Sequence, residues 1–148
     1  MTTSPFVKLD GVAKRWNGQL GVEGITLDIP EGSFTALLGP SGCGKSTTLR
    51  LLAGLELPDE GKILIDGKDV TTSAASDRNL SMVFQSYALF PHLSVAENVM
   101  FGLKVRRVPK KERLEKLHRA LEITGLLGLE DRKPGELSGG QRQRVALA

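Results

Sequence analysis

The chain has 148 residues, the size of one domain, and 20 Lys and Arg against 17 Asp and Glu give it a net charge of +3. So small an excess does not indicate a nucleic-acid partner unless the basic residues gather in one stripe. The single cysteine excludes an intrachain disulfide and the first residues lack the pattern of a secretion signal, so a reducing intracellular compartment is favoured. No apolar run approaches the roughly 18 residues of a membrane span.

Short apolar runs broken by glycines predict an antiparallel β layer over the first thirty residues. Its strands are expected at "FVKL" and "ITLDI", and Pro30-Glu31-Gly32 is expected to form a turn between strands. The next run, "SFTALLG" at 33–39, is almost wholly apolar and predicts a strand buried on both faces. A helix is expected over 45–53, with Gly54 near its end.

The middle of the chain predicts two further strands. Ile63 and Ile65 alternate with Lys62 and Asp66, which indicates a strand and turn bounded by glycines. The apolar "LSMVFQ" at 80–85 predicts a second buried strand.

Two helices are expected after these strands. Ser94 and Glu97 fit a capping box, which predicts that a helix starts at Val95. Another helix is expected to begin after Pro109, and three leucines share one face of it: Leu114, Leu117 and Leu121.

Residues 39–46 match the phosphate-loop pattern, a glycine followed after four residues by Gly-Lys-Ser, between a predicted strand and a predicted helix. Glycines let backbone N–H groups converge on phosphate oxygens, and the helix adds its positive end. We expect Lys45 to reach the β and γ phosphates and the Ser46 hydroxyl to ligate Mg²⁺. Cys43 is most simply a tolerated small residue, but its place beside Lys45 predicts reactivity. The candidate nucleotide-binding residues of the loop are Gly39, Pro40, Ser41, Gly42, Cys43, Gly44, Lys45, Ser46 and Thr47.

With three further features the chain resembles the nucleotide-binding subunits of ATP-binding cassette (ABC) transporters over essentially its whole length. These are Trp16, 23 positions before Gly39; "VFQSYALFPHLSVAENV", which contains Gln85; and "LSGGQ" at 137–141, about ninety residues after the phosphate loop. Within that family, "GPSGCGKSTTLRLLAGLELPDEGKILIDGKDV" and "RNLSMVFQSYALFPHLSVAENV" most resemble importers of sugars and glycerol phosphates, with polyamine importers next.

The resemblance implies roles for three side chains. Trp16 would stack on the adenine base, although a half-buried strand aromatic is the alternative. Gln85 would contact Mg²⁺ and the attacking water and link the site to the membrane subunit, with a structural amide as the alternative. Lys45 and Gln85 are thus the candidate catalytic residues, and Ser46 and Gln85 the candidate metal ligands.

The signature sequence also predicts an anion site from its residues. Ser138 and Gln141 fit a capping box, and the two glycines leave the first-turn amides uncovered. The resemblance implies that this site binds the γ-phosphate held by a second subunit, in a head-to-tail dimer that sandwiches two ATP molecules. The residues concerned are Leu137, Ser138, Gly139, Gly140 and Gln141.

The one concentrated basic run, 104–116, has a leucine stripe and favours an amphipathic helix with a solvated face over nucleic-acid binding. The resemblance implies an α/β P-loop NTPase fold with an antiparallel β subdomain and an α-helical subdomain. We expect a β layer and P-loop core over about 1–93, the helical subdomain over about 94–137 and the signature helix over 138–148.

The implied function is ATP hydrolysis coupled to import of a small solute, with ATP and Mg²⁺ as cofactors. The implied partners are a second ATPase subunit, membrane permease subunits and a solute-binding protein, at the cytoplasmic face of the inner membrane. In the family, the acidic residues that act at Mg²⁺ and on the attacking water end an apolar strand that follows the signature helix, and a switch histidine comes later. The sequence contains neither this strand nor this histidine. We therefore expect an N-terminal part of a longer ATPase, inactive alone. A DNA-repair or ribosome-associated ABC ATPase, and a nucleotide-binding piece without hydrolysis, remain as alternatives.

Overall fold

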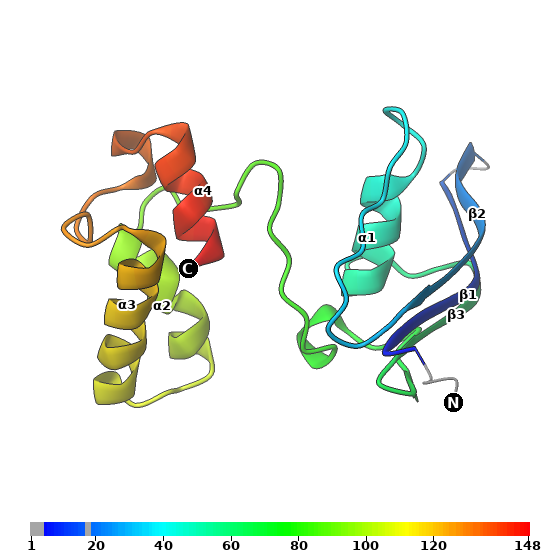
Figure 1. Ribbon diagram of the computed structural model, residues 1–148, viewed down its shortest axis with the longest axis horizontal. Helices are drawn as coiled ribbons and strands as arrows, with labels where there is room; N and C mark the ends of the chain where they lie inside the picture. Colours follow the sequence, from blue (N-terminus) through cyan, green and yellow to red (C-terminus); the bar gives the residue numbers. More distant parts are fainter. Residues whose placement is uncertain (1–4, 17–18) are drawn as a thin grey trace. The chain divides into compact units, whose positions relative to one another are not determined.

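The computed structural model describes residues 5–16 and 19–148, which form two compact units that meet in sequence at Met82 and Val83 (Figure 1). The first unit is a small sheet with one helix, and the second unit is helical. Among the described residues no helix is both long and apolar enough to cross a membrane.

The sheet of the first unit is antiparallel throughout. It consists of β1 (Val7–Trp16), β2 (Gln19–Ile29), β3 (Glu60–Ile65) and β4 (Lys68–Asp69), in the order β2-β1-β3-β4. Asp66 and Gly67 join β3 to β4 with φ angles of 50° and 70°, as a tight hairpin turn requires. The antiparallel layer and the strand and turn around Ile63 and Ile65 are thus confirmed.

Helix α1 (Lys45–Ala53) packs on this sheet, with the bounds that the sequence predicts (Figure 1). Gly54 ends it in the left-handed conformation, with φ of 74°. The shared core consists of side chains from β1, β2, β3 and α1: Val7, Leu9, Val12, Val22, Leu51 and Ile63. Because α1 follows the phosphate loop directly, this packing fixes the loop against the sheet.

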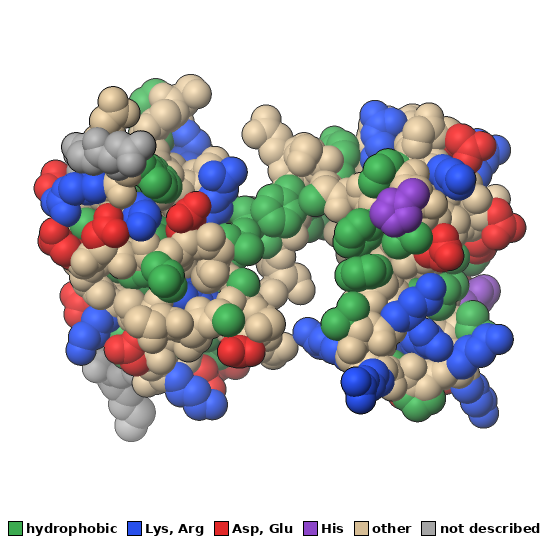
Figure 2. Space-filling model, turned by 180° about the vertical axis from the view of Figure 1, so that it is seen from behind, with side chains coloured by type: hydrophobic (Ala, Val, Ile, Leu, Met, Phe, Trp, Pro, Cys, Tyr) green, Lys and Arg blue, Asp and Glu red, His purple; other side chains and the backbone are tan. Residues whose placement is uncertain are grey.

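The two predicted buried strands, 33–39 and 80–85, do not form in the described part of the chain. Both runs are irregular, and the side chains of Phe34 and Leu38 are 96% and 91% exposed. Apolar side chains accordingly lie on the surface of both units (Figure 2). A buried strand is stabilised by ladder hydrogen bonds to its neighbours, and no described strand pairs with either run. The turn at Pro30-Glu31-Gly32 does form, but it leads from β2 into irregular chain rather than into a strand.

The second unit consists of α2 (Val95–Val105), α3 (Lys110–Thr124) and α4 (Gly139–Leu147). Helix α2 begins with the predicted capping box, in which the Ser94 hydroxyl accepts from Glu97 N–H at 3.2 Å and Ser94 N–H donates to the Glu97 carboxylate at 2.9 Å. Of the predicted leucine stripe on α3, two members are buried and Leu114 is half exposed. The core consists of Val95, Leu117, Leu121, Leu126, Leu137 and Val145.

Candidate functional site

The phosphate loop adopts backbone conformations that favour glycine. Gly39, Gly42 and Gly44 have φ angles of 154°, 85° and 95°. A Cβ on Gly39 would lie 2.6 Å from Cys43 Sγ, and a Cβ on Gly44 would lie 2.4 Å from Val22 Cγ1. Gly44 is therefore required both by conformation and by close approach to Val22 and the Gly21 carbonyl, whereas conformation is the main requirement at Gly39 and Gly42.

The first turn of α1 presents amide donors without a side-chain acceptor. Gly44 is the N-cap and makes no side-chain capping bond, and no acidic residue lies in the first turn. Thr48 N–H makes the first intrahelical bond, to the Gly44 carbonyl at 2.8 Å. The amides ahead of Thr48 thus form the donor set that, with the helix dipole, binds anions in proteins.

Lys45 folds back onto the loop beside these amides. Its Nζ donates to the carbonyls of Gly39 and Pro40, both at 2.7 Å, and lies 3.4 Å from Cys43 Sγ. The Ser46 hydroxyl follows on the exposed side of the same turn. The Lys45 ammonium and the Ser46 hydroxyl therefore lie next to the uncapped amides.

Trp16 ends β1, and its indole lies over Gly21 of β2. A Cβ on Gly21 would meet Trp16 Cζ3 at 2.2 Å and Cε3 at 2.7 Å. The strand register explains this contact, because Lys14 pairs with Val22 and Arg15 with Leu20, so that Gly21 lies opposite neither and forms a bulge.

The same bulge touches the phosphate loop. The Gly21 carbonyl lies 3.2 Å from the point where a Cβ on Gly44 would stand. Trp16, Gly21 and Gly44 are thus successive neighbours, and Trp16 is 38% exposed. The structure brings the predicted base-stacking and phosphate-binding residues together in one unit.

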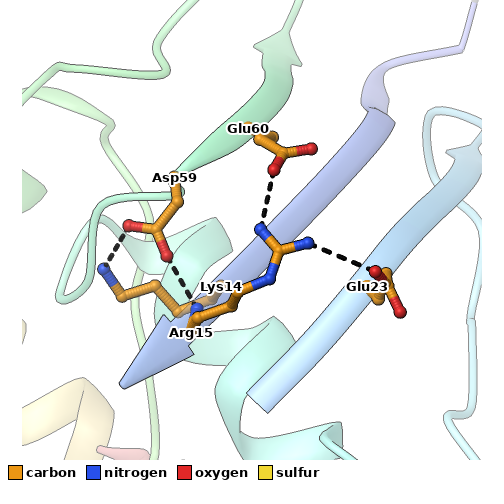
Figure 3. A network of polar contacts seen from close by, with 5 residues as sticks. All are labelled: Lys14, Arg15, Glu23, Asp59 and Glu60. Carbon is orange, nitrogen blue, oxygen red and sulfur yellow. Dashed lines mark hydrogen bonds and ion pairs between the residues drawn. The ribbon is translucent and has the colours of Figure 1, made fainter. Parts of the chain in front are cut away.

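A polar network surrounds the end of β1 next to Trp16 (Figure 3). The Arg15 guanidinium spans the sheet, from Glu60 on β3 at 2.7 Å to Glu23 on β2 at 3.2 Å. The Asp59 carboxylate accepts from Arg15 N–H at 2.7 Å and from Lys14 Nζ at 3.1 Å. These bonds lower the pKa of Asp59, chiefly through the Arg15 amide, while the hydrogen bond to Glu60 raises the pKa of Arg15. Sequence reasoning missed this network.

Gln85 lies in the second unit, at the start of an exposed turn over 85–88. Tyr87 and Ala88 in this turn have φ angles of 64° and 50°, a conformation uncommon for residues with a side chain. The turn is followed by a segment tied to α2, where Asn98 exchanges hydrogen bonds with the Phe90 backbone at 2.8 and 3.2 Å. The role of Gln85 in catalysis and in metal binding stays a prediction.

The signature sequence also lies in the second unit, where it begins α4 with the predicted capping box. Ser138 N–H donates to Gln141 Oε1 at 2.8 Å, and Gln141 N–H donates to Ser138 Oγ at 3.2 Å. Leu137 is buried in the core, whereas Gly139 and Gly140 are exposed. Around a Cβ on Gly140 no described atom lies within 4 Å, and the nearest to one on Gly139 is at 4.0 Å. Packing within the unit therefore does not require either glycine.

Metal ligation by the chain alone is not indicated. Among the described residues no group of three or more His, Cys, Asp or Glu is placed to hold an ion. His92 is exposed, and its ring lies edge-on to that of Phe90 with centroids 6.1 Å apart. A cation at the phosphate loop would therefore depend on oxygen ligands from a bound molecule as well as on the Ser46 hydroxyl.

Known proteins resemble this chain in sequence and in fold. A family model described as ABC transporter matches residues 22–148. The Fe(3+) ions import ATP-binding proteins FbpC of Photorhabdus laumondii and Escherichia coli K12 are each 53% identical over 148 residues, all of this chain and 42% of the relative. The sulfate/thiosulfate import ATP-binding protein CysA of Thermosynechococcus vestitus is 51% identical over 142 residues, 96% of this chain and 42% of the relative. The structure of cbiO1 from Clostridium perfringens, described as part of the ABC transporter complex cbiONQ, matches with a TM-score of 0.85 and 32% identity, over 98% of this chain and 60% of that one.

Proposed function

The chain belongs to the ABC transporter family, and from this premise we propose that it is the nucleotide-binding part of the ATP-binding subunit of an importer. Its fold is the P-loop NTPase fold of that family, with an antiparallel β subdomain and an α-helical subdomain. The observation that carries the proposal is the uncapped α1 N-terminus, preceded by the glycine loop and flanked by Lys45 and Trp16. The chain spans 42% of the length of these relatives, so the activity proposed here is that of the whole protein.

We propose the following roles in the first unit. The backbone N–H groups of residues 39–47 other than Pro40, together with the Lys45 ammonium, bind the phosphates of ATP, while the Trp16 indole stacks on the base. The Ser46 hydroxyl holds Mg²⁺ together with phosphate oxygens. For Gln85 of the second unit, contact with Mg²⁺ and with the attacking water stays a proposal. When bound, Mg²⁺ neutralises charge on the transferred phosphoryl group.

For the signature segment we propose a second phosphate site that acts on ATP held by another subunit. Glycine inside a helix destabilises it by about 1 kcal/mol relative to alanine. Because packing within the unit requires neither Gly139 nor Gly140, the close approach of an external ligand is the physical reason that remains. This supports a head-to-tail dimer in which Ser138 to Gln141 face the γ-phosphate held by the partner, while Leu137 anchors the segment in the core.

The proposed partners are permease subunits and a solute-binding protein, at the cytoplasmic face of the inner membrane. The names of the relatives, which are import proteins, support this over a role in DNA repair or on the ribosome. The names state that these relatives import Fe(3+) ions or sulfate and thiosulfate. They therefore favour an inorganic ion and do not support the sugar, glycerol phosphate or polyamine that the sequence suggested. The subdomain boundaries at about 93 and 137 stay a prediction.

A calorimetric titration with MgATP tests the nucleotide site. Lys45→Ala should raise the Kd at least about tenfold, the loss of one charge-assisted contact to phosphate. Lys62→Ala removes an exposed lysine from β3 and should leave the Kd unchanged. Equal Kd values for the parent chain and Lys45→Ala would contradict the proposal.

A further inference from the structure

The end of β1 that carries Trp16 has a strand neighbour on one side only. Toward β2 the pairing continues to Trp16, whose partner is Gln19. Toward β3 the last pair is Ala13 with Glu60, three residues before Trp16. The backbone N–H and C=O groups of β1 that face β3 beyond Ala13 therefore need another hydrogen-bond partner.

Asp59 extends the ladder by one step. Its N–H donates to the Ala13 carbonyl at 2.9 Å, as the next residue of a strand would. Its carboxylate, in place of a backbone carbonyl, accepts from Arg15 N–H at 2.7 Å, and Lys14 Nζ at 3.1 Å supports it (Figure 3). The Asp59 side chain thus fixes the Lys14–Arg15 peptide, one residue before Trp16.

The other members of the network are weaker candidates for this role. The Arg15 pairs with Glu60 and Glu23 join side chains that are 38% and 62% exposed, and such surface pairs contribute little. Only the Asp59 carboxylate bonds the backbone of β1 itself, next to the residue whose position matters.

We propose that Asp59 is a positioning residue for nucleotide binding, which sets the place of the Trp16 indole over Gly21 by holding the Arg15 amide. Asp59 directly precedes β3, so its N–H and its carboxylate both hold β1 from the β3 side. The inference rests on the proposed function, because it needs Trp16 to contact the base. It predicts that loss of the Asp59 carboxylate weakens binding of the base and spares binding of the phosphates.

The test compares MgATP with magnesium tripolyphosphate, which has no base, on the 148-residue chain. Trp16→Ala should raise the Kd for MgATP about tenfold, and Asp59→Ala about fivefold, since stacking on one aromatic ring has that magnitude. Asp59→Asn keeps an acceptor and should stay within about twofold of the parent. Asp10→Ala, which removes an exposed carboxylate elsewhere on β1, is the matched control. The Kd for tripolyphosphate should be the same in all variants.

The double variant Trp16→Ala with Asp59→Ala should bind MgATP no more weakly than Trp16→Ala alone, because Asp59 acts through Trp16. Trp16 is the only tryptophan, so acrylamide quenching of its fluorescence reports its position without nucleotide, and quenching should increase in Asp59→Ala. If Asp59→Ala does not fold by circular dichroism, Asp59→Ser carries the same expectations. Additive losses, equal losses for both ligands or unchanged quenching would overturn the inference. Trp16→Ala with an unchanged Kd would instead refute the proposed role of Trp16.

Discussion

Gly21→Ala gives the sharpest test of the site geometry, since it adds one methyl group beneath the Trp16 indole. The new Cβ would lie 2.2 Å from Cζ3, 2.7 Å from Cε3 and 3.0 Å from the Lys14 carbonyl oxygen. Carbon atoms in contact stand about 3.5–4.0 Å apart, so the ring must move by more than about 1 Å. The φ angle of Gly21 is not positive, and the effect is therefore steric rather than a backbone strain.

A displaced ring loses most of its overlap with the base. Since removal of the ring should raise the Kd for MgATP about tenfold, its displacement in Gly21→Ala should raise that Kd by between about fivefold and tenfold, with that for tripolyphosphate unchanged. The assay is a calorimetric titration of both ligands, with Gly102→Ala as control, because a Cβ on Gly102 meets no described atom within 4 Å. An unchanged affinity for MgATP in Gly21→Ala would refute the placement of the base on Trp16.

Three further predictions concern other side chains of the first unit. Alkylation of Cys43, which is exposed and 3.4 Å from Lys45 Nζ, should be slowed by MgATP, and equal rates with and without nucleotide would contradict its place in the phosphate site. Arg78 is 3% exposed, its pKa is lowered by burial, and it donates to the carbonyls of Leu51, Leu52, Thr71 and Ser73. Arg78→Met leaves these carbonyls without their donor and should lower the free energy of unfolding, measured in urea, by about 3 kcal/mol or more. The control Arg119→Met, at an exposed residue, should leave it unchanged. The folded-state pKa of Asp59 is lowered, so its contribution to stability is present above about pH 4 and is lost as the pH falls through the folded pKa. The urea midpoints of the parent and Asp59→Asn should therefore converge from pH 6 to pH 3, and a constant difference would count against the network.

The helix boundaries could be predicted because their signals are local. Gly54 ends α1, and Ser94 and Ser138 begin α2 and α4, each through bonds to residues within a few positions. The prediction of buried strands at the apolar runs 33–39 and 80–85 was wrong. Their pattern shows suitability for a buried strand, but a strand also needs partners distant in sequence, which the pattern does not contain.

Some residues of the candidate site could likewise be predicted from the sequence and others could not. The phosphate loop and the signature are contiguous motifs, and the sequence identifies them directly. Asp59 and Gly21 were missed because their roles depend on where β1 stops pairing with β3 and on a shift of register against β2. For Gly21 a signal existed, since an isolated glycine within a strand pattern suggests a bulge or a close approach. For Asp59 the sequence offers none.

We propose that the phosphate loop and Trp16 form one nucleotide site in the first unit. Because Trp16 is the only tryptophan, its fluorescence during titration with MgATP measures both parts at once. We expect a saturable fluorescence change in the parent chain. Lys45→Ala should shift it to at least about tenfold higher MgATP concentration, and tripolyphosphate should give a smaller change. A signal that does not respond to MgATP, or that responds equally in the parent and in Lys45→Ala, would contradict it.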